Sequence, residues 1–308
     1  MGTRILVGTT HGLWQASGEA LEPVDGFADR RISALALRDD KAWAVLDGRT
    51  LMQRSGGRWE ERASLSNGRA TCLAVTPTGA LVGIVGPHLL RLKGDALEPI
   101  TSFDTVEGRD AWYTPWGAPS EVRSIAVAID GAFYVNVHVG GVVRSRDAGR
   151  SWTPTVDIEA DVHQVLAHPE RPDVVLAAAQ HGFGLSLDGG NSWRFFTNGM
   201  HAHYARAVTV SGATVLISTS TGPHGHRAAL YRRPLDGDGT FERCSDGLPW
   251  FDGNIDTACL DAQGSVVVFG TSDGRVFHST DAGLHWSLLA KSLPTITAVV
   301  IDTAVDVS

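Results

Sequence analysis

Short apolar runs separated by turns recur along the whole chain. A representative stretch has β-rich runs at 123–129, 133–139 and 141–145, then a turn and a fourth short run at 151–154. Short runs rich in Val, Ile, Phe and Tyr and bounded by Gly, Asp and Ser predict strands. No stretch of ten or more residues shows a convincing helical period. The pattern therefore predicts a meander of four antiparallel strands, which we label A to D in chain order.

The meander repeats along the chain. A strands are expected to begin near residues 31, 69, 123, 162, 204, 254 and 295. Because the chain opens on a B strand at 5–8, the last A strand, at 296–302, should pair with it. Such closure leaves no long sheet edge exposed. The sequence thus predicts an all-β fold: a seven-bladed β-propeller of four-stranded antiparallel blades, closed by pairing the C-terminal strand with the N-terminal blade.

The predicted ring is a single domain. Its blades are expected at 4–25 together with 294–303, then 31–63, 69–101, 122–156, 162–197, 204–244 and 254–290.

One turn sequence, Ser-x-Asp-x-Gly-x-x-Trp, occurs three times, beginning at Ser145, Ser186 and Ser279. In such a turn the Asp carboxylate can accept hydrogen bonds from turn amides, the Gly takes a positive φ, and the Trp packs between neighbouring blades. We therefore expect structural roles for Asp147, Trp152, Asp188, Trp193, Asp281 and Trp286.

These turns resemble the Asp boxes of the bacterial neuraminidase (BNR) repeat superfamily, and the resemblance extends over nearly the whole chain. The superfamily includes sialidases, sortilin-type receptors, xyloglucanase-like glycosidases and photosystem II assembly factors. The resemblance implies the propeller fold but no single activity, because hydrolases, binding modules and scaffolds share that fold. It also implies that the ligand face is the one opposite the Asp boxes, where the D–A and B–C loops emerge.

The net charge and the cysteine content limit the classes of binding partner and indicate a cellular location. The net charge is −8 and basic residues form no block, which argues against nucleic acid and anionic membranes. No run of 18 apolar residues predicts a membrane span. The N-terminus lacks the apolar stretch of a signal peptide. The three cysteines, Cys72, Cys244 and Cys259, form no spaced framework, so we expect reduced thiols and a cytoplasmic location.

Histidines are concentrated in the loops of the expected ligand face. Neutral imidazoles bind transition metals and act as acids or bases near pH 7. The candidates for catalysis, or for ligands of a divalent transition metal, are His138, His163, His181 and His203. Hydrogen bonding of these imidazoles to loop carbonyls is the structural alternative.

Arginines and aromatic residues lie on the same expected face. Guanidinium groups near the starts of A strands would favour a carboxylate or phosphate. The long loop 102–121 carries three aromatic side chains that could stack on a sugar or another flat ligand. Arg206, two residues into its strand, joins the candidate catalytic residues. The candidate substrate-binding residues are Trp112, Tyr113, Trp116, Arg31, Arg69, Arg123, Tyr204, Trp250, Asp252 and Asn254.

The favoured function is a small-molecule or glycan site in the funnel over the central channel, with arginines for an anionic group on the ligand. Whether the protein converts the bound molecule chemically is left open. One alternative is a non-catalytic scaffold that binds a protein on the same face. The other is a glycoside hydrolase of sialidase-like type, although residues 30–33 (Arg-Arg-Ile-Ser) lack the aromatic residue and the proline of the sialidase arginine motif. A hydrolase would also need two facing carboxylates, and no spacing pairs two of them.

Overall fold

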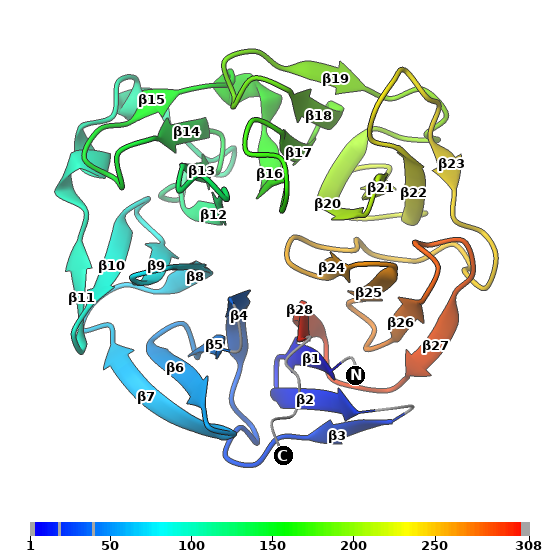
Figure 1. Ribbon diagram of the computed structural model, residues 1–308, viewed down its shortest axis with the longest axis horizontal. Coiled ribbons are helices and arrows are strands. Elements are labelled where there is room, and N and C mark those ends of the chain that lie inside the picture. The colour runs from blue at the N-terminus through cyan, green and yellow to red at the C-terminus, as the bar shows by residue number, and fades with distance from the viewer. Residues whose placement is uncertain (1–3, 18–19, 39–40, 303–308) are drawn as a thin grey trace.

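Seven four-stranded antiparallel sheets surround a central axis in the computed structural model, which describes residues 4–17, 20–38 and 41–302. Figure 1 shows the sheets as the blades of a ring. The described residues contain no α-helix, and their three short 3-10 helices are η1 (Thr101–Thr105), η2 (Arg109–Ala111) and η3 (Ile158–Ala160). The predicted seven-bladed β-propeller is confirmed.

The strands follow chain order within each blade, apart from the blade that contains both chain ends. Blade 1 comprises β28 (Ile296–Asp302), β1 (Arg4–Thr9), β2 (Gly12–Ser17) and β3 (Leu21–Pro23). Blade 2 comprises β4 (Ile32–Arg38), β5 (Lys41–Leu46), β6 (Thr50–Ser55) and β7 (Arg58–Ser64). Blade 3 comprises β8 (Ala70–Thr76), β9 (Gly79–Ile84), β10 (Leu89–Lys93) and β11 (Ala96–Pro99). Blade 4 comprises β12 (Val122–Val127), β13 (Phe133–Val137), β14 (Gly141–Ser145) and β15 (Thr153–Pro154).

The remaining blades have the same order. Blade 5 comprises β16 (Val162–Ala167), β17 (Val175–Ala179), β18 (Gly182–Ser186) and β19 (Arg194–Phe196). Blade 6 comprises β20 (Tyr204–Ser211), β21 (Thr214–Ser220), β22 (Ala229–Pro234) and β23 (Glu242–Arg243). Blade 7 comprises β24 (Leu260–Gln263), β25 (Val266–Gly270), β26 (Val276–Ser279) and β27 (Ser287–Ala290).

The ring closes within blade 1. Strand β28 pairs antiparallel with β1, with Arg4 opposite Asp302 and Ile5 opposite Ile301. The two strands lie side by side in Figure 1 although they come from opposite ends of the sequence. The predicted closure is therefore confirmed. Residue 303, the expected last residue of blade 1, lies outside the described residues.

The first strand of blade 7 differs from the prediction. It begins at Leu260 rather than at Asn254, because residues 256–259 form a turn in which the amide of Cys259 donates to the carbonyl of Asp256 at 3.0 Å. The Thr257 hydroxyl in this turn lies 3.1 Å from the carbonyl oxygens of both His163 and Arg206. The turn thus joins blade 7 to the inner strands of blades 5 and 6.

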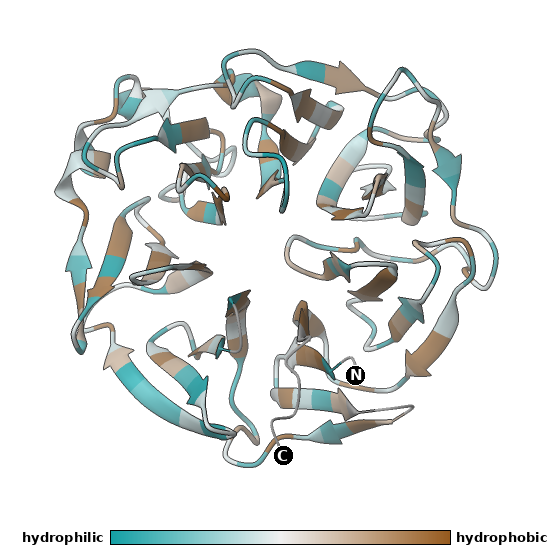
Figure 2. Cartoon of the chain, viewed as in Figure 1, coloured by the Kyte–Doolittle hydropathy of each residue, from teal (hydrophilic) through white to brown (hydrophobic). Residues whose placement is uncertain are grey.

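Apolar side chains from the inner strands form the core. Every residue of β13 and β17 is buried, whereas most of β7, on the rim, is exposed. Figure 2 shows the same difference in hydropathy between β13 and β7. Burial of apolar surface, worth roughly 25 cal/mol per Å², therefore holds neighbouring blades together. The three cysteines are buried and unpaired. No helix among the described residues has the length and apolarity of a membrane span.

The three Ser-x-Asp-x-Gly-x-x-Trp turns, which we call Asp-box turns for short, share one geometry. In the first, Oδ1 of Asp147 accepts from the amides of Arg150 and Ser151 at 3.0 and 2.9 Å, and Oδ2 accepts from the Ser151 hydroxyl at 2.6 Å. Hydrogen bonds from Ser192 lower the pKa of Asp188 to about 2 in the second box. The glycine at the fifth position has φ between 81° and 85° in all three copies. These carboxylates thus accept hydrogen bonds within their own turns.

Candidate functional site

A cavity of about 770 Å³, which we call the upper cavity, lies over blades 4 to 6. Its walls come from D–A loops, such as the residues before Tyr204, and from B–C loops, such as residues 220–224. Since antiparallel strands alternate in direction, these loops emerge at one end of the blades and the Asp-box turns at the other. The cavity lies where the ligand face was predicted. Six of the predicted site residues line it: Trp116, Arg123, His138, His203, Tyr204 and Arg206.

The floor of the cavity contains an ion pair. Nη1 of Arg123 lies 3.5 Å from Oδ1 of Asp161, and both side chains are nearly buried. Oδ2 of Asp161 lies 3.4 Å from Nε2 of His163, which is fully buried and whose Nδ1 donates to the carbonyl of Ala205 at 2.5 Å. Burial opposes ionisation of Asp161, but the proximity of His163 and Arg123 outweighs it and lowers the pKa of the carboxyl. Asp161 is thus a carboxylate at neutral pH.

Arg206 is the second guanidinium of the floor. Its Nη1 donates to Oδ1 of Asp256 at 3.0 Å, and its Nη2 lies 3.5 Å from the Tyr204 hydroxyl. The guanidinium also lies over the ring of Tyr204, 5.3 Å from its centroid. Asp256 belongs to the turn that replaces the start of the blade 7 A strand, so this turn positions Arg206 as well.

His138 forms the wall next to Trp116. The two rings meet edge to face, with centroids 4.8 Å apart, and the His138 side chain is buried while Trp116 is 67% exposed. Burial, together with the charge of Arg123, lowers the pKa of His138 to about 4. His138 is therefore neutral near pH 7, and it is a poor general base at that pH.

Buried polar atoms without hydrogen-bond partners gather at this floor. Among the described residues they include Nη1 of Arg123, Nε of Arg206 and Nδ1 of His138. Buried polar groups are normally hydrogen-bonded, so a group without a partner marks a place where a bound molecule can supply the missing hydrogen bond.

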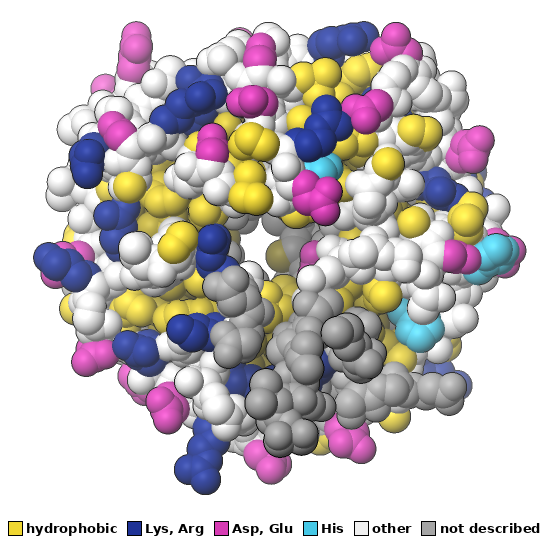
Figure 3. All heavy atoms as spheres, viewed as in Figure 1, with side chains coloured by type: hydrophobic (Ala, Val, Ile, Leu, Met, Phe, Trp, Pro, Cys, Tyr) yellow, Lys and Arg dark blue, Asp and Glu magenta, His cyan; other side chains and the backbone are white. Residues whose placement is uncertain are grey.

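Arg123 and Arg206 also line a second cavity of about 500 Å³, which we call the central channel. It is formed by the inner strands β4, β8, β12 and β16 and by residues of blades 1, 6 and 7. Figure 3 shows the ring open at its centre. The two guanidiniums therefore stand where the upper cavity and the channel meet.

Several predicted residues lie elsewhere. His181 and Asp252 are exposed and line neither cavity, and the same holds for Arg31 and Arg69. Arg69 lies instead 3.6 Å from Glu121 in an ion pair.

The predicted aromatic residues also divide. Trp112 packs against Phe103 and lies beneath Arg109, so it anchors the long loop. The Tyr113 hydroxyl points to Glu159, at 3.4 Å. Trp250 contacts His201, which lines the cavity, with ring centroids 4.7 Å apart.

Asn254 supports the cavity wall without lining it. Its Oδ1 accepts from the Ser220 hydroxyl at 2.5 Å and its Nδ2 donates to the carbonyl of Pro223 at 3.1 Å. Ser220 and Pro223 both line the cavity.

The described residues show no group of three or more His, Cys, Asp or Glu side chains that could hold a metal ion. Of the four histidines suggested as ligands, His138 and His203 line the cavity, His163 lies below it, and His181 is outside. The metal site remains a prediction.

Asp161 and Asp256 were not among the predicted site residues. A signal for Asp161 existed in the sequence, because Asp161 and His163 are two residues apart at the start of a strand, where alternate side chains share a face. No comparable signal existed for Asp256, since its position depends on the turn at 256–259.

Comparison with known proteins supports the fold. No protein-family model and no curated protein matches the chain. A solved structure of YCF48 bound to a D1 peptide is 14% identical, with a TM-score of 0.58, covering 91% of this chain and 87% of that one. An ancestral GH74 enzyme is 14% identical, with a TM-score of 0.64, and the match covers 85% of this chain but only 39% of the enzyme. The WD40 repeats of RRP9 are 15% identical, with a TM-score of 0.58, covering 84% of this chain and 80% of that one.

These neighbours are a peptide complex, an enzyme and a WD40 propeller. At such identities the likeness shows the seven-bladed architecture, and that architecture serves binding proteins and enzymes alike.

Proposed function

We propose that the protein binds a small organic anion, a sugar acid or another carboxylate, in the cavity over blades 4 to 6. The ligand's carboxylate lies at Arg123 and Arg206, and its ring or apolar part lies beside Trp116. The supporting observation is that both guanidiniums line the cavity, while several buried polar atoms around them make no hydrogen bond within the described residues. An unsatisfied buried donor costs about 1–3 kcal/mol, which an accepting ligand would recover.

The chemistry of the floor favours an oxyanion. A guanidinium has five N–H donors, so the contacts of Arg123 and Arg206 with Asp161 and Asp256 leave donors available. Two guanidiniums together suit the two oxygens of a carboxylate. The exposed face of Trp116 offers a stacking surface for a ring.

The protein binds this ligand without hydrolysing it. A glycosidase needs an acid and a second carboxylate roughly 5–10 Å apart. Asp161 is the one carboxylate among the described residues that line the cavity, and its lowered pKa suits it poorly to donate a proton.

Saturation-transfer NMR with two matched ligand pairs tests the proposal. Glucuronate is compared with glucose, and hexanoate with hexanol. A carboxylate member of either pair should receive saturation and its neutral partner should not. Arg123→Gln and Arg206→Gln should each weaken binding by roughly tenfold or more, because a charge-assisted hydrogen bond is worth about 1.5–3 kcal/mol. Arg31→Gln, at an exposed position outside both cavities, is the control. Equal binding of neutral ligands, or binding that survives both variants, would contradict the proposal.

A peptide with an acidic group or a free C-terminus is the second candidate. It is favoured by the exposed aromatic side chains of Tyr113, Trp116 and Trp250, which are 43%, 67% and 37% exposed. Such residues are enriched in protein interfaces. Trp250→Ala separates the candidates, since Trp250 lines neither cavity and its loss should weaken a peptide that extends beyond the pocket but not hexanoate.

A further inference from the structure

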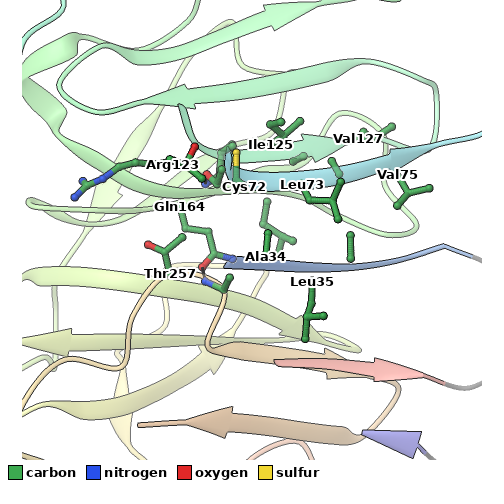
Figure 4. Close-up of a pocket in the computed structure, with 18 of the residues that line it drawn as sticks. Ala34, Leu35, Cys72, Leu73, Val75, Arg123, Ile125, Val127, Gln164 and Thr257 are labelled. Atoms are coloured by element: carbon green, nitrogen blue, oxygen red, sulfur yellow. Dashed lines mark hydrogen bonds between the residues drawn. The ribbon is translucent and has the colours of Figure 1, made fainter. Parts of the chain in front are cut away.

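The central channel changes in polarity along its length. At the end near the upper cavity its lining includes Thr71, Gln164, the guanidiniums of Arg123 and Arg206, and the carboxylates of Glu121 and Asp256. Farther along the same strands the lining is aliphatic, at residues 35–37 of β4, 73–75 of β8 and 125–127 of β12. Figure 4 shows this arrangement, with Arg123 at one end and Val75 and Val127 at the other. The channel is thus polar at the end near the upper cavity, apolar along much of its wall, and lined by Arg38 at its far end.

The apolar wall is built by a repeated sequence. The triplets at 35–37, 73–75 and 125–127 read Leu-Ala-Leu, Leu-Ala-Val and Ile-Ala-Val, and residues 165–167 of β16 read Val-Leu-Ala. The central residue of the first three triplets is alanine, which adds little bulk to the inner strands. Of the flanking side chains, Leu37, Val75, Ile125 and Val127 are half-buried, whereas Leu35 and Leu73 are buried in the core. Four consecutive blades therefore present hydrocarbon to one side of the channel.

We propose that the ligand of the upper cavity is an alkyl carboxylate, whose hydrocarbon tail lies in the central channel while its carboxylate is held by Arg123 and Arg206. This inference rests on the proposed function and specifies the ligand's class. Both arginines line both cavities, so a single molecule can place its head at the guanidiniums and its tail against the aliphatic wall. A cavity of about 500 Å³ has room for a medium-length chain.

The energetics favour a tail over channel water. Burying a methylene group is worth about 0.8 kcal/mol, which corresponds to a factor of about four in affinity when burial is complete. Because the channel wall is polar on the side of blades 6 and 7, a factor of about two to four per methylene is expected.

Isothermal titration calorimetry with butanoate, hexanoate, octanoate and decanoate, all below micelle-forming concentrations, tests the inference. Affinity should rise about two- to fourfold per methylene in the unmodified protein. Val75→Phe and Val127→Phe fill the apolar part of the channel and should abolish this rise while leaving butanoate binding unchanged. Retained butanoate binding also shows that the variants fold. Leu284→Phe, at a 52% exposed position in the third Asp box, is the matched control.

The outcomes separate the two proposals. If butanoate binds in a manner that requires Arg123 and chain length adds nothing, the inference fails and the proposed function stands. It also fails if the rise persists in both channel-filled variants. Arg38 lines the opposite end of the channel, so a loss of decanoate binding in Arg38→Gln but not in Arg123→Gln would overturn the assigned orientation. If no carboxylate binds, the proposed function fails and the inference fails with it.

Discussion

The two ends of the blades both contain buried or hydrogen-bonded aspartates, but they use them in different ways. At one end the three Asp-box carboxylates accept hydrogen bonds from their own turns, and the arrangement recurs with nearly the same distances. At the other end Asp161 occurs once, and it faces Arg123 of the neighbouring blade 4 and His163 of its own blade. The repeated carboxylates accept hydrogen bonds from their own turns, whereas Oδ1 of Asp161 makes an ion pair with Arg123 at 3.5 Å and no hydrogen bond within the described residues. Repetition here marks structure, and departure from the repeat marks the candidate site.

The largest contrast should appear in tryptophan variants. Trp286, in the third Asp box, is 5% exposed, and Trp286→Ala should lower the free energy of unfolding by about 3–5 kcal/mol. Trp116, in the upper cavity, is 67% exposed, and Trp116→Ala should change it by no more than about 0.5 kcal/mol. Denaturant unfolding measures both. Similar losses in the two variants would show that the division into structural and binding ends is mistaken.

The second largest difference between the two ends of the blades should appear in the pH dependence of the unfolding free energy. His138 has a pKa of about 4 in the folded protein against an ordinary value of 6.5. As the pH falls from 6.5 to 4, the unfolded chain takes up a proton that the folded protein excludes, so stability declines in this window. Asp188, with its pKa lowered from 3.8 to about 2, contributes stability that is present above pH 3.8 and lost as the pH falls towards 2.

Unfolding free energies between pH 7 and pH 2 check this expectation. His138→Gln should reduce the decline between pH 6.5 and 4 and leave the lower window unchanged. Asp188→Asn should do the reverse. If Asp188→Asn flattened the upper window instead, the assignment of the two pKa values to the two ends would be wrong.

The smallest expected effect concerns a contact between blades. The buried Tyr134 hydroxyl of blade 4 donates to the carbonyl of Gly189 in the second Asp box at 3.1 Å. Tyr134→Phe should cost about 1 kcal/mol of unfolding free energy, because Arg144 also donates to that carbonyl and partly satisfies it. Ligand binding in the upper cavity should not change. A loss of binding in Tyr134→Phe would indicate that the two ends are coupled.

The sequence predicts the ring well because its signals are local and repeated. Asp147, Asp188 and Asp281 recur at blade spacing, and the apolar runs between them alternate with turns. The sequence pattern places the start of the blade 7 A strand near Asn254, but the strand begins at Leu260, because the turn at 256–259 is held by contacts with His163 and Arg206, which are distant in sequence. Tertiary contacts of that kind leave no local pattern.

The site is predicted less completely for a related reason. Loop position fixes the end of the blade at which a side chain emerges, but not its direction. His138 and His203 line the cavity while His181, in a similar B–C position, is exposed outside it. Trp112 was expected to meet ligand, yet Phe103 and Arg109 enclose it within its own loop. Packing against neighbouring residues sets the direction of each side chain, and no local sequence pattern indicates that packing.

The closure of the ring has a mechanical consequence. Because Arg4 pairs with Asp302, the outer ends of β1 and β28 lie at the same end of their shared ladder. Tension applied to the two ends of the chain would therefore peel this ladder apart one pair at a time instead of shearing all its hydrogen bonds together. The β1–β28 ladder of blade 1 therefore holds the ring closed, and tension on the two chain ends should separate it before the force reaches any other blade.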